Sequence, residues 1–164
     1  MRAVQEPGLA PLSAKDVQEM LNQHIPYRIR LLLDALPRVP ARCDADNQAF
    51  EAGTVSGRIL LGFLGLRYEE KTGQLREDRT HRTNKEGLTD DVKVRDVGGQ
   101  FVDLATLSSE EAATLCKFIH GAHKACAHFT IGSDHELDVC TYQQSVPIIV
   151  RLLRGCLPSK QGNP

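Results

Sequence analysis

The histidine and cysteine side chains of residues 108–130 are the first candidates for chemistry. Cys116, His120 and His123 are four and three residues apart, so in a helix they lie on one flank. A thiolate and two imidazoles on one flank can form part of a transition-metal site. Further ligands would have to come from elsewhere, and half-buried histidines are common at such positions. We therefore predict no cofactor and keep this group as an alternative metal site.

His128 and Arg58 fit simple helix packing least well. His128 stands near the end of a predicted helix, where the helix dipole favours the imidazolium form by about 0.3–1 kcal/mol. It can act as a general acid or base, or it can bond a neighbouring backbone carbonyl. Arg58 interrupts an apolar stretch and must reach solvent or a carboxylate. The candidate carboxylates are Asp90, Asp91, Asp96 and Asp134.

Motifs for nucleotide chemistry are absent from the sequence. It contains no GxxxxGK[ST] phosphate loop, no GxGxxG turn and no GxSxG nucleophile turn. The formal net charge is −1, from 20 basic and 21 acidic residues. The totals therefore lack the basic surplus that nucleic-acid binding uses, although a local basic patch would still permit it.

The sequence predicts that the elements positioning these side chains are helices. Apolar residues recur at helical spacing, and capping residues and prolines mark the helix ends. This pattern predicts an all-α bundle of about five or six helices. One domain should cover 13–157, between a loose arm at 1–12 and a tail at 158–164. The expected helices start at Ser13, after Pro26, at Asp44 or Asp46, at Ser108, at Asp134 and near Pro147.

The third predicted helix, which should reach about Tyr68, carries small residues at every fourth position. Ala45, Ala49, Gly53 and Gly57 would form a stripe without large side chains. Each interior glycine costs a helix roughly 1 kcal/mol relative to alanine. Close packing of another helix on the stripe is the favoured explanation, and a groove for a ligand or partner is the alternative.

Residues 67–91 are polar and mixed in charge, and they predict a long connecting loop. After it, residues 92–97 and 100–104 could form a small hairpin, because Gly98-Gly99 supplies the positive φ values of a tight turn.

Length, cysteine content and hydropathy indicate the size class and the cellular location of the protein. Its 164 residues suit one domain. The five cysteines form no CxxC pair, which favours free thiols in a reducing cytosol. The most apolar run, residues 59–66, is too short to span a bilayer, and the N-terminus has no signal-like apolar segment. We expect a cytoplasmic protein that does not insert into membranes.

Three segments carry a resemblance to known proteins: Phe50–Leu66 (FEAGTVSGRILLGFLGL), Asp91-Val92 and Lys124–Thr130. Over residues 45–135 the pattern resembles small uncharacterised bacterial helical proteins. It is also similar to the HEPN class of helical bundles, several of which are ribonucleases in toxin–antitoxin or defence systems. That class carries an Arg followed by a His on a late helix, and here Lys124 and His128 take those places. The resemblance implies either a nuclease site at His128, Lys124 and Arg58 or an inactive relative.

Three functional interpretations follow. The first, which the sequence favours, is a non-enzymatic interaction or regulatory module with a protein partner or a second copy of the chain. The second is the HEPN-like ribonuclease, and the third is a metal-binding bundle that uses Cys116, His120 and His123.

Overall fold

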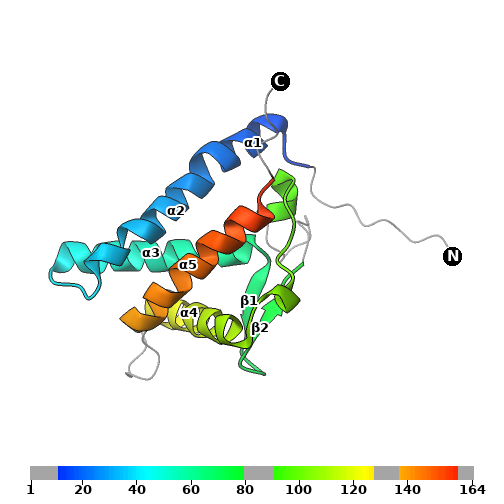
Figure 1. The fold of residues 1–164 in the computed structure, drawn as a ribbon. Coiled ribbons are helices and arrows are strands. Elements are labelled where there is room, and N and C mark those ends of the chain that lie inside the picture. The colour runs from blue at the N-terminus through cyan, green and yellow to red at the C-terminus, as the bar shows by residue number, and fades with distance from the viewer. Residues whose placement is uncertain (1–10, 80–90, 128–136, 159–164) are drawn as a thin grey trace.

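The computed structural model describes residues 11–79, 91–127 and 137–158, and this part of the chain is mainly helical (Figure 1). It contains four long helical segments and a two-stranded antiparallel sheet. The helical class is therefore confirmed, with fewer helices than the predicted five or six. The elements are α1 (Ala14–Glu19), the π-helical turn η1 (Met20–His24), α2 (Ile25–Asp34), α3 (Asp44–Phe63), β1 (Leu66–Glu69), β2 (Gln74–Glu77), α4 (Ser109–Ala127) and α5 (Val139–Cys156), with short 3-10 turns η2 (Leu36–Arg38), η3 (Val94–Val97) and η4 (Leu104–Thr106).

The N-terminal helix runs unbroken from α1 through η1 into α2. Its start is the predicted capping box, in which Asp16 N–H donates to Ser13 Oγ at 3.2 Å. The sequence predicted that Pro26 ends or restarts this helix; it does not end it, and the α-helical geometry resumes at Ile25 with Pro26 in the first turn of α2. A proline lacks an N–H and its ring clashes with the carbonyl four residues earlier. The wider π-helical turn directly before it, closed by Ile25 N–H donating to Met20 O, accommodates both defects.

The small-residue stripe on α3 is a packing surface, as the favoured explanation predicted. A Cβ added at Gly53 would collide with the Tyr142 hydroxyl and lie 2.9 Å from Ala35 Cβ. One added at Gly57 would lie 2.6 Å from the Phe118 ring. The glycines therefore let α2, α4 and α5 pack close to α3.

The segment after α3 differs from both predictions made for it. The helix ends at Phe63 instead of near Tyr68, because Gly65 turns into the left-handed region at φ 79°. The hairpin β1–β2 then occupies the first part of the predicted loop, with Leu66 paired to Glu77. Leu66 and Leu75 point into the core, so this hairpin is anchored by one apolar residue in each strand.

The predicted hairpin at 92–104 is wrong. That segment forms the 3-10 turns η3 and η4. Gly98, at φ 85°, ends η3. Gly99 then lets the chain pass the end of α5, where Gln100 N–H donates to Cys156 O at 2.9 Å. The two glycines thus serve a close backbone approach rather than a strand turn.

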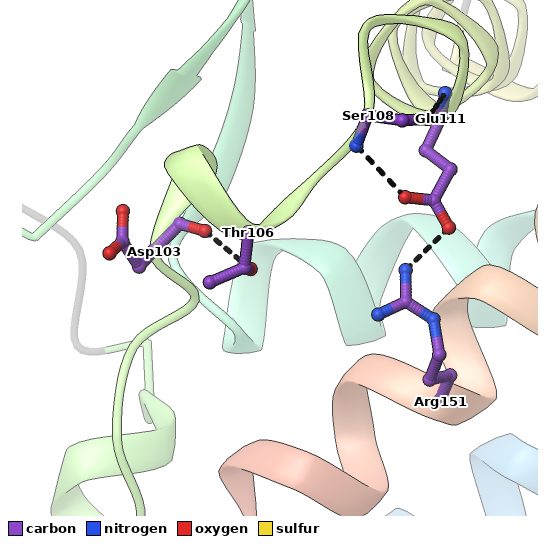
Figure 2. A network of polar contacts seen from close by, with 5 residues as sticks. All are labelled: Asp103, Thr106, Ser108, Glu111 and Arg151. Carbon is purple, nitrogen blue, oxygen red and sulfur yellow. Dashed lines mark hydrogen bonds and ion pairs between the residues drawn. The ribbon is translucent and has the colours of Figure 1, made fainter.

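The start of α4 is the predicted capping box, and it is also tied to α5 (Figure 2). Ser108 N–H donates to Glu111 Oε2 at 3.0 Å, and Glu111 N–H donates to Ser108 Oγ at 3.1 Å. Arg151 of α5 pairs with Glu111 Oε1 at 2.5 Å. These contacts lower the pKa of Glu111, chiefly through the Ser108 backbone hydrogen bond.

Helix α5 is one continuous helix that includes Pro147. Its N-cap is Asp138, which accepts from Thr141 N–H at 2.8 Å, whereas the predicted start at Asp134 lies outside the described residues. In the core, Tyr142 of α5 donates to Leu32 O of α2 at 2.7 Å. None of the described helices is both long enough and apolar enough to cross a membrane.

Candidate functional site

A surface groove of about 630 Å³ lies between the N-terminal helix and α3. We call it the α2–α3 groove. Figure 1 shows these two helices meeting at the connection between them and diverging from it. The lining residues fall into two kinds. The apolar ones are Met20, Ile25, Val55, Ile59, Leu60, Phe63 and Val92, with Gly62, and the charged or titratable ones are His24, Arg28, Arg58, Asp91 and Lys93.

The apolar part of the groove is open to solvent. Val55 is 37% exposed and Ile59 is 44% exposed. Together with Phe63 they are spaced four apart, so they form one ridge along α3. The opposite wall includes the π-helical turn, and such single π turns are frequent at functional sites.

Two guanidinium groups in the groove have no carboxylate partner among the residues that the structure describes. Arg28 and Arg58 are both half-buried, and both line the groove. Among the described residues neither forms an ion pair, and Arg28 only stacks on Tyr27, with its guanidinium carbon 5.7 Å from the ring centroid. These two guanidinium groups outnumber the one carboxylate that lines the described groove, that of Asp91, and so favour an anionic ligand beside the apolar surface.

The carboxylates predicted as possible partners of Arg58 differ in where they lie relative to the groove. Asp91 is exposed and lines the same groove. Asp96 instead accepts from Lys93 N–H at 2.7 Å. Asp90 and Asp134 lie outside the described residues.

Lys93 closes the groove at the end of α3. It is only 7% exposed, and its Nζ donates to Gly62 O at 3.0 Å and to Asp78 Oδ2 at 3.2 Å. The first contact places a cation at the negative end of the α3 dipole. The ammonium charge is thus already compensated within the protein, and Lys93 acts as a strut that joins three segments.

The predicted catalytic group is only partly described. Arg58 lies in the groove. Lys124 belongs to the last turns of α4, its side chain is outside the described part, and His128 lies beyond it. Helix α4 contributes no described residue to the groove. A grouping of His128, Lys124 and Arg58 stays a prediction.

The predicted metal-binding flank of α4 faces the hairpin. Cys116 Sγ donates to Gly73 O at 3.1 Å, and burial raises the pKa of this thiol. The His120 ring stacks on Tyr68 with 4.7 Å between centroids. No three His, Cys, Asp or Glu side chains in the described ranges are grouped to hold a metal ion. The contacts that are present on this flank join α4 to the sheet.

Comparison of the chain with protein-family models, with curated proteins and with solved structures finds no match. The interpretation of the site therefore depends on its own geometry. Of the groove residues, sequence reasoning selected Arg58 and Asp91 but missed Arg28 and Lys93. The sequence signal for Arg28 is weaker than that for Arg58, because Arg30 interrupts the same apolar stretch and does not line the groove.

Proposed function

We propose that the chain is a non-enzymatic interaction module whose α2–α3 groove binds an acidic segment of a partner protein, a segment that also carries apolar side chains. The observation that carries the proposal is the pair of half-buried arginines without carboxylate partners among the described residues. They stand beside the exposed Val55 and Ile59.

The energetics of the groove favour such a partner. A carboxylate can accept two parallel hydrogen bonds from one guanidinium, and such charge-assisted bonds are roughly twice as strong as neutral ones. Full burial of an exposed aliphatic side chain contributes about 1.5–3 kcal/mol, and covering Ile59, which is 44% exposed, contributes part of this. A segment with acidic and apolar side chains gains both the hydrogen bonds to arginine and the apolar burial. A basic segment gains only the apolar burial.

The lining supports binding rather than catalysis. Its described part has no cysteine, serine or threonine to act as a nucleophile. His24 is paired with Glu19 at 3.3 Å, and Lys93 is held by Asp78 and Gly62. The groups left for a ligand are the two guanidinium groups, which bind anions, and the exposed carboxylate of Asp91.

Fluorescence anisotropy with two labelled amphipathic peptides of about twelve residues, each about 18 Å long as a helix, tests the proposal. The peptides share their leucines and differ only in carrying glutamates or lysines. We expect the glutamate peptide to bind more tightly than the lysine peptide. Arg28→Glu and Arg58→Glu should each lower the affinity for the glutamate peptide about tenfold, which is about 1.4 kcal/mol.

The matched control is Arg154→Glu, which makes the same charge change at an exposed position on α5. It should leave the affinity unchanged, and circular dichroism melts should show that all three variants fold. Binding of neither peptide, a preference for the lysine peptide, or equal affinity of wild type and both groove variants would contradict the proposal.

A further inference from the structure

We infer that the partner at the α2–α3 groove is a second copy of this chain, and that α3 of each copy lies antiparallel along the exposed face of α3 in the other. The acidic partner segment is then the first half of α3. This inference rests on the proposed function, because it names the partner whose acidic segment the groove binds.

The exposed face of α3 has the residue spacing of a helix-pairing surface. Its members are separated by alternating steps of four and three residues, which is the spacing of the a and d positions of a coiled coil, and they are Gln48, Ala52, Val55, Ile59 and Gly62. We call this row the α3 seam. None of its five residues is buried, and Val55 and Ile59 are 37% and 44% exposed. From residue 48 to residue 62 the seam extends about 21 Å, so a second helix can lie along it.

Two charges of opposite sign stand beside the α3 seam. Glu51 is exposed and Arg58 is half-buried. Because they are seven residues apart, they lie on the same flank of the helix. Within the described part of the chain neither side chain forms an ion pair. They are about 10.5 Å apart along the helix axis, which is too far for them to pair with each other in one molecule.

An antiparallel arrangement of two copies brings these opposite charges together. A two-fold axis near Val55 places residue 51 of each copy level with residue 58 of the other, and it turns the same flank of both helices to the same side. Glu51 of one copy then meets Arg58 of the other, and the symmetry forms this pair twice. Val55 packs against its own counterpart, and Ile59 covers the small Ala52 of the other copy.

A parallel arrangement offers no such match. In a parallel pair the flank with Glu51 and Arg58 faces the opposite flank of the neighbouring helix. That flank carries Ala49, Ser56 and Phe63, of which Ser56 and Phe63 are buried within the fold. It has no charge that could meet either Glu51 or Arg58. The charges therefore select the antiparallel arrangement.

The first half of α3 has the chemistry proposed for the partner segment. Residues 44–57 contain three acidic residues and no basic one. Helices α2 and α3 are antiparallel, with Ala35 against Gly53 and Leu32 against Gly57, so Arg28 is level with about residues 60–61 of α3. The same two-fold axis brings residues 48–49 of the other copy to this level, between its Asp44 and its Glu51. Both groove arginines thus face the acidic half of the partner helix.

The dimer should be weak. A contact of two helices over this length belongs to the small end of specific interfaces, below about 1,200 Å² of buried surface. Its formation follows mass action, so sedimentation velocity of the whole protein from about 10 to about 500 μM measures it. We expect the dimer fraction of the wild type to rise across this range.

Exchange of the two charges tests the pairing. Arg58→Glu and Glu51→Arg each place like charges opposite one another twice in the dimer, so each should raise the dissociation constant of the dimer at least about tenfold. The double variant Glu51→Arg/Arg58→Glu forms two opposite pairs again, and it should return to within about threefold of the wild type. The controls Glu70→Arg in the hairpin turn and Arg154→Glu on α5, both at exposed positions, should leave the dissociation constant unchanged. Circular dichroism melts should show that all variants fold.

Glu51→Arg also separates this inference from the proposed function, because Glu51 does not line the groove. It should weaken the dimer and leave the affinity for the glutamate peptide unchanged or higher. A wild type that stays monomeric, single variants without effect, or a double variant that is not restored overturns the pairing. The proposed function still stands in these cases if the glutamate peptide binds through Arg58. A dimer that the exchange restores, with no binding of either peptide, supports the pairing and overturns the wider preference for acidic segments.

Discussion

At the scale of single residues, one tight contact between the helices is centred on glycine. Gly53 lies under the Tyr142 hydroxyl, and that hydroxyl donates to Leu32 O. Burial raises the pKa of Tyr142 well above its ordinary value, so the phenol stays protonated and remains a donor. One missing side chain on α3 thus makes room for the hydrogen bond that joins α5 to α2.

Gly53→Ala should therefore destabilise the protein although alanine is the better helix former. Its Cβ would collide with Tyr142 and crowd Ala35, and such overpacking costs about 1–3 kcal/mol. Gly62→Ala is the matched control on the same helix, because no atom lies within 4 Å of the added Cβ. Its free energy of unfolding should stay the same or rise by up to about 1 kcal/mol. Urea unfolding measures both, and equal effects would contradict the packing argument.

Residues differ in how far sequence could assign them a role. Arg58 was selected because it interrupts an apolar helix, which is a local signal. Lys93 gave no such signal, since its partners Asp78 and Gly62 are 15 and 31 residues away in the chain. Only the fold brings these three residues together, so neither the buried ion pair nor the closed end of the groove could be predicted.

At the scale of elements, the starts of α1 and α4 were predictable because their caps are local. Ser13 with Asp16, and Ser108 with Glu111, are three residues apart and their hydrogen bonds are present. The hairpin β1–β2 was missed for the opposite reason. Its strands have four residues each, and they are stabilised by Leu66 and Leu75 packing into a distant core. Such short strands lack the long alternation that identifies a strand in sequence.

The cap of α5 gives a prediction at this scale. Hydrogen bonds from the Thr141 hydroxyl and backbone lower the pKa of Asp138. Because the folded pKa lies below the unfolded value of about 3.9, this stabilisation is present above that value and is lost as pH falls through the folded pKa. Asp138→Ala should cost about 1 kcal/mol at neutral pH.

Asp138→Asn separates the cap from its charge, since asparagine caps helices as well as aspartate does. Between about pH 5 and pH 2, where carboxylates of this kind become protonated, the wild type should lose more stability than this variant. Thermal melts across this range measure the difference. Parallel curves for the two proteins would show that the Asp138 charge contributes nothing to the helix start.

At the scale of the whole molecule, charge is balanced overall and uneven locally. The 20 basic and 21 acidic residues nearly cancel, so net charge alone steers no particular partner. The local imbalance lies in the α2–α3 groove, where Arg28 and Arg58 lack carboxylates among the described residues. The residue counts alone could exclude a strongly basic nucleic-acid binder. They could not reveal this site, because the number of charged residues does not say where they lie in the fold.

This contrast predicts how salt should affect binding of the acidic peptide. Steering by net charge acts on association rates, and a nearly neutral protein has little to screen. The association rate constant should therefore change by less than about twofold when ionic strength rises from about 0.05 to 0.5 M. Contact pairs in the groove are partly screened over the same range, so the dissociation rate constant should rise about threefold to fivefold. Stopped-flow fluorescence measures both constants, and Arg58→Glu should reduce the salt effect on dissociation. A steep fall in the association rate constant would instead mean that a broad positive surface, and not two arginines in a groove, attracts the partner.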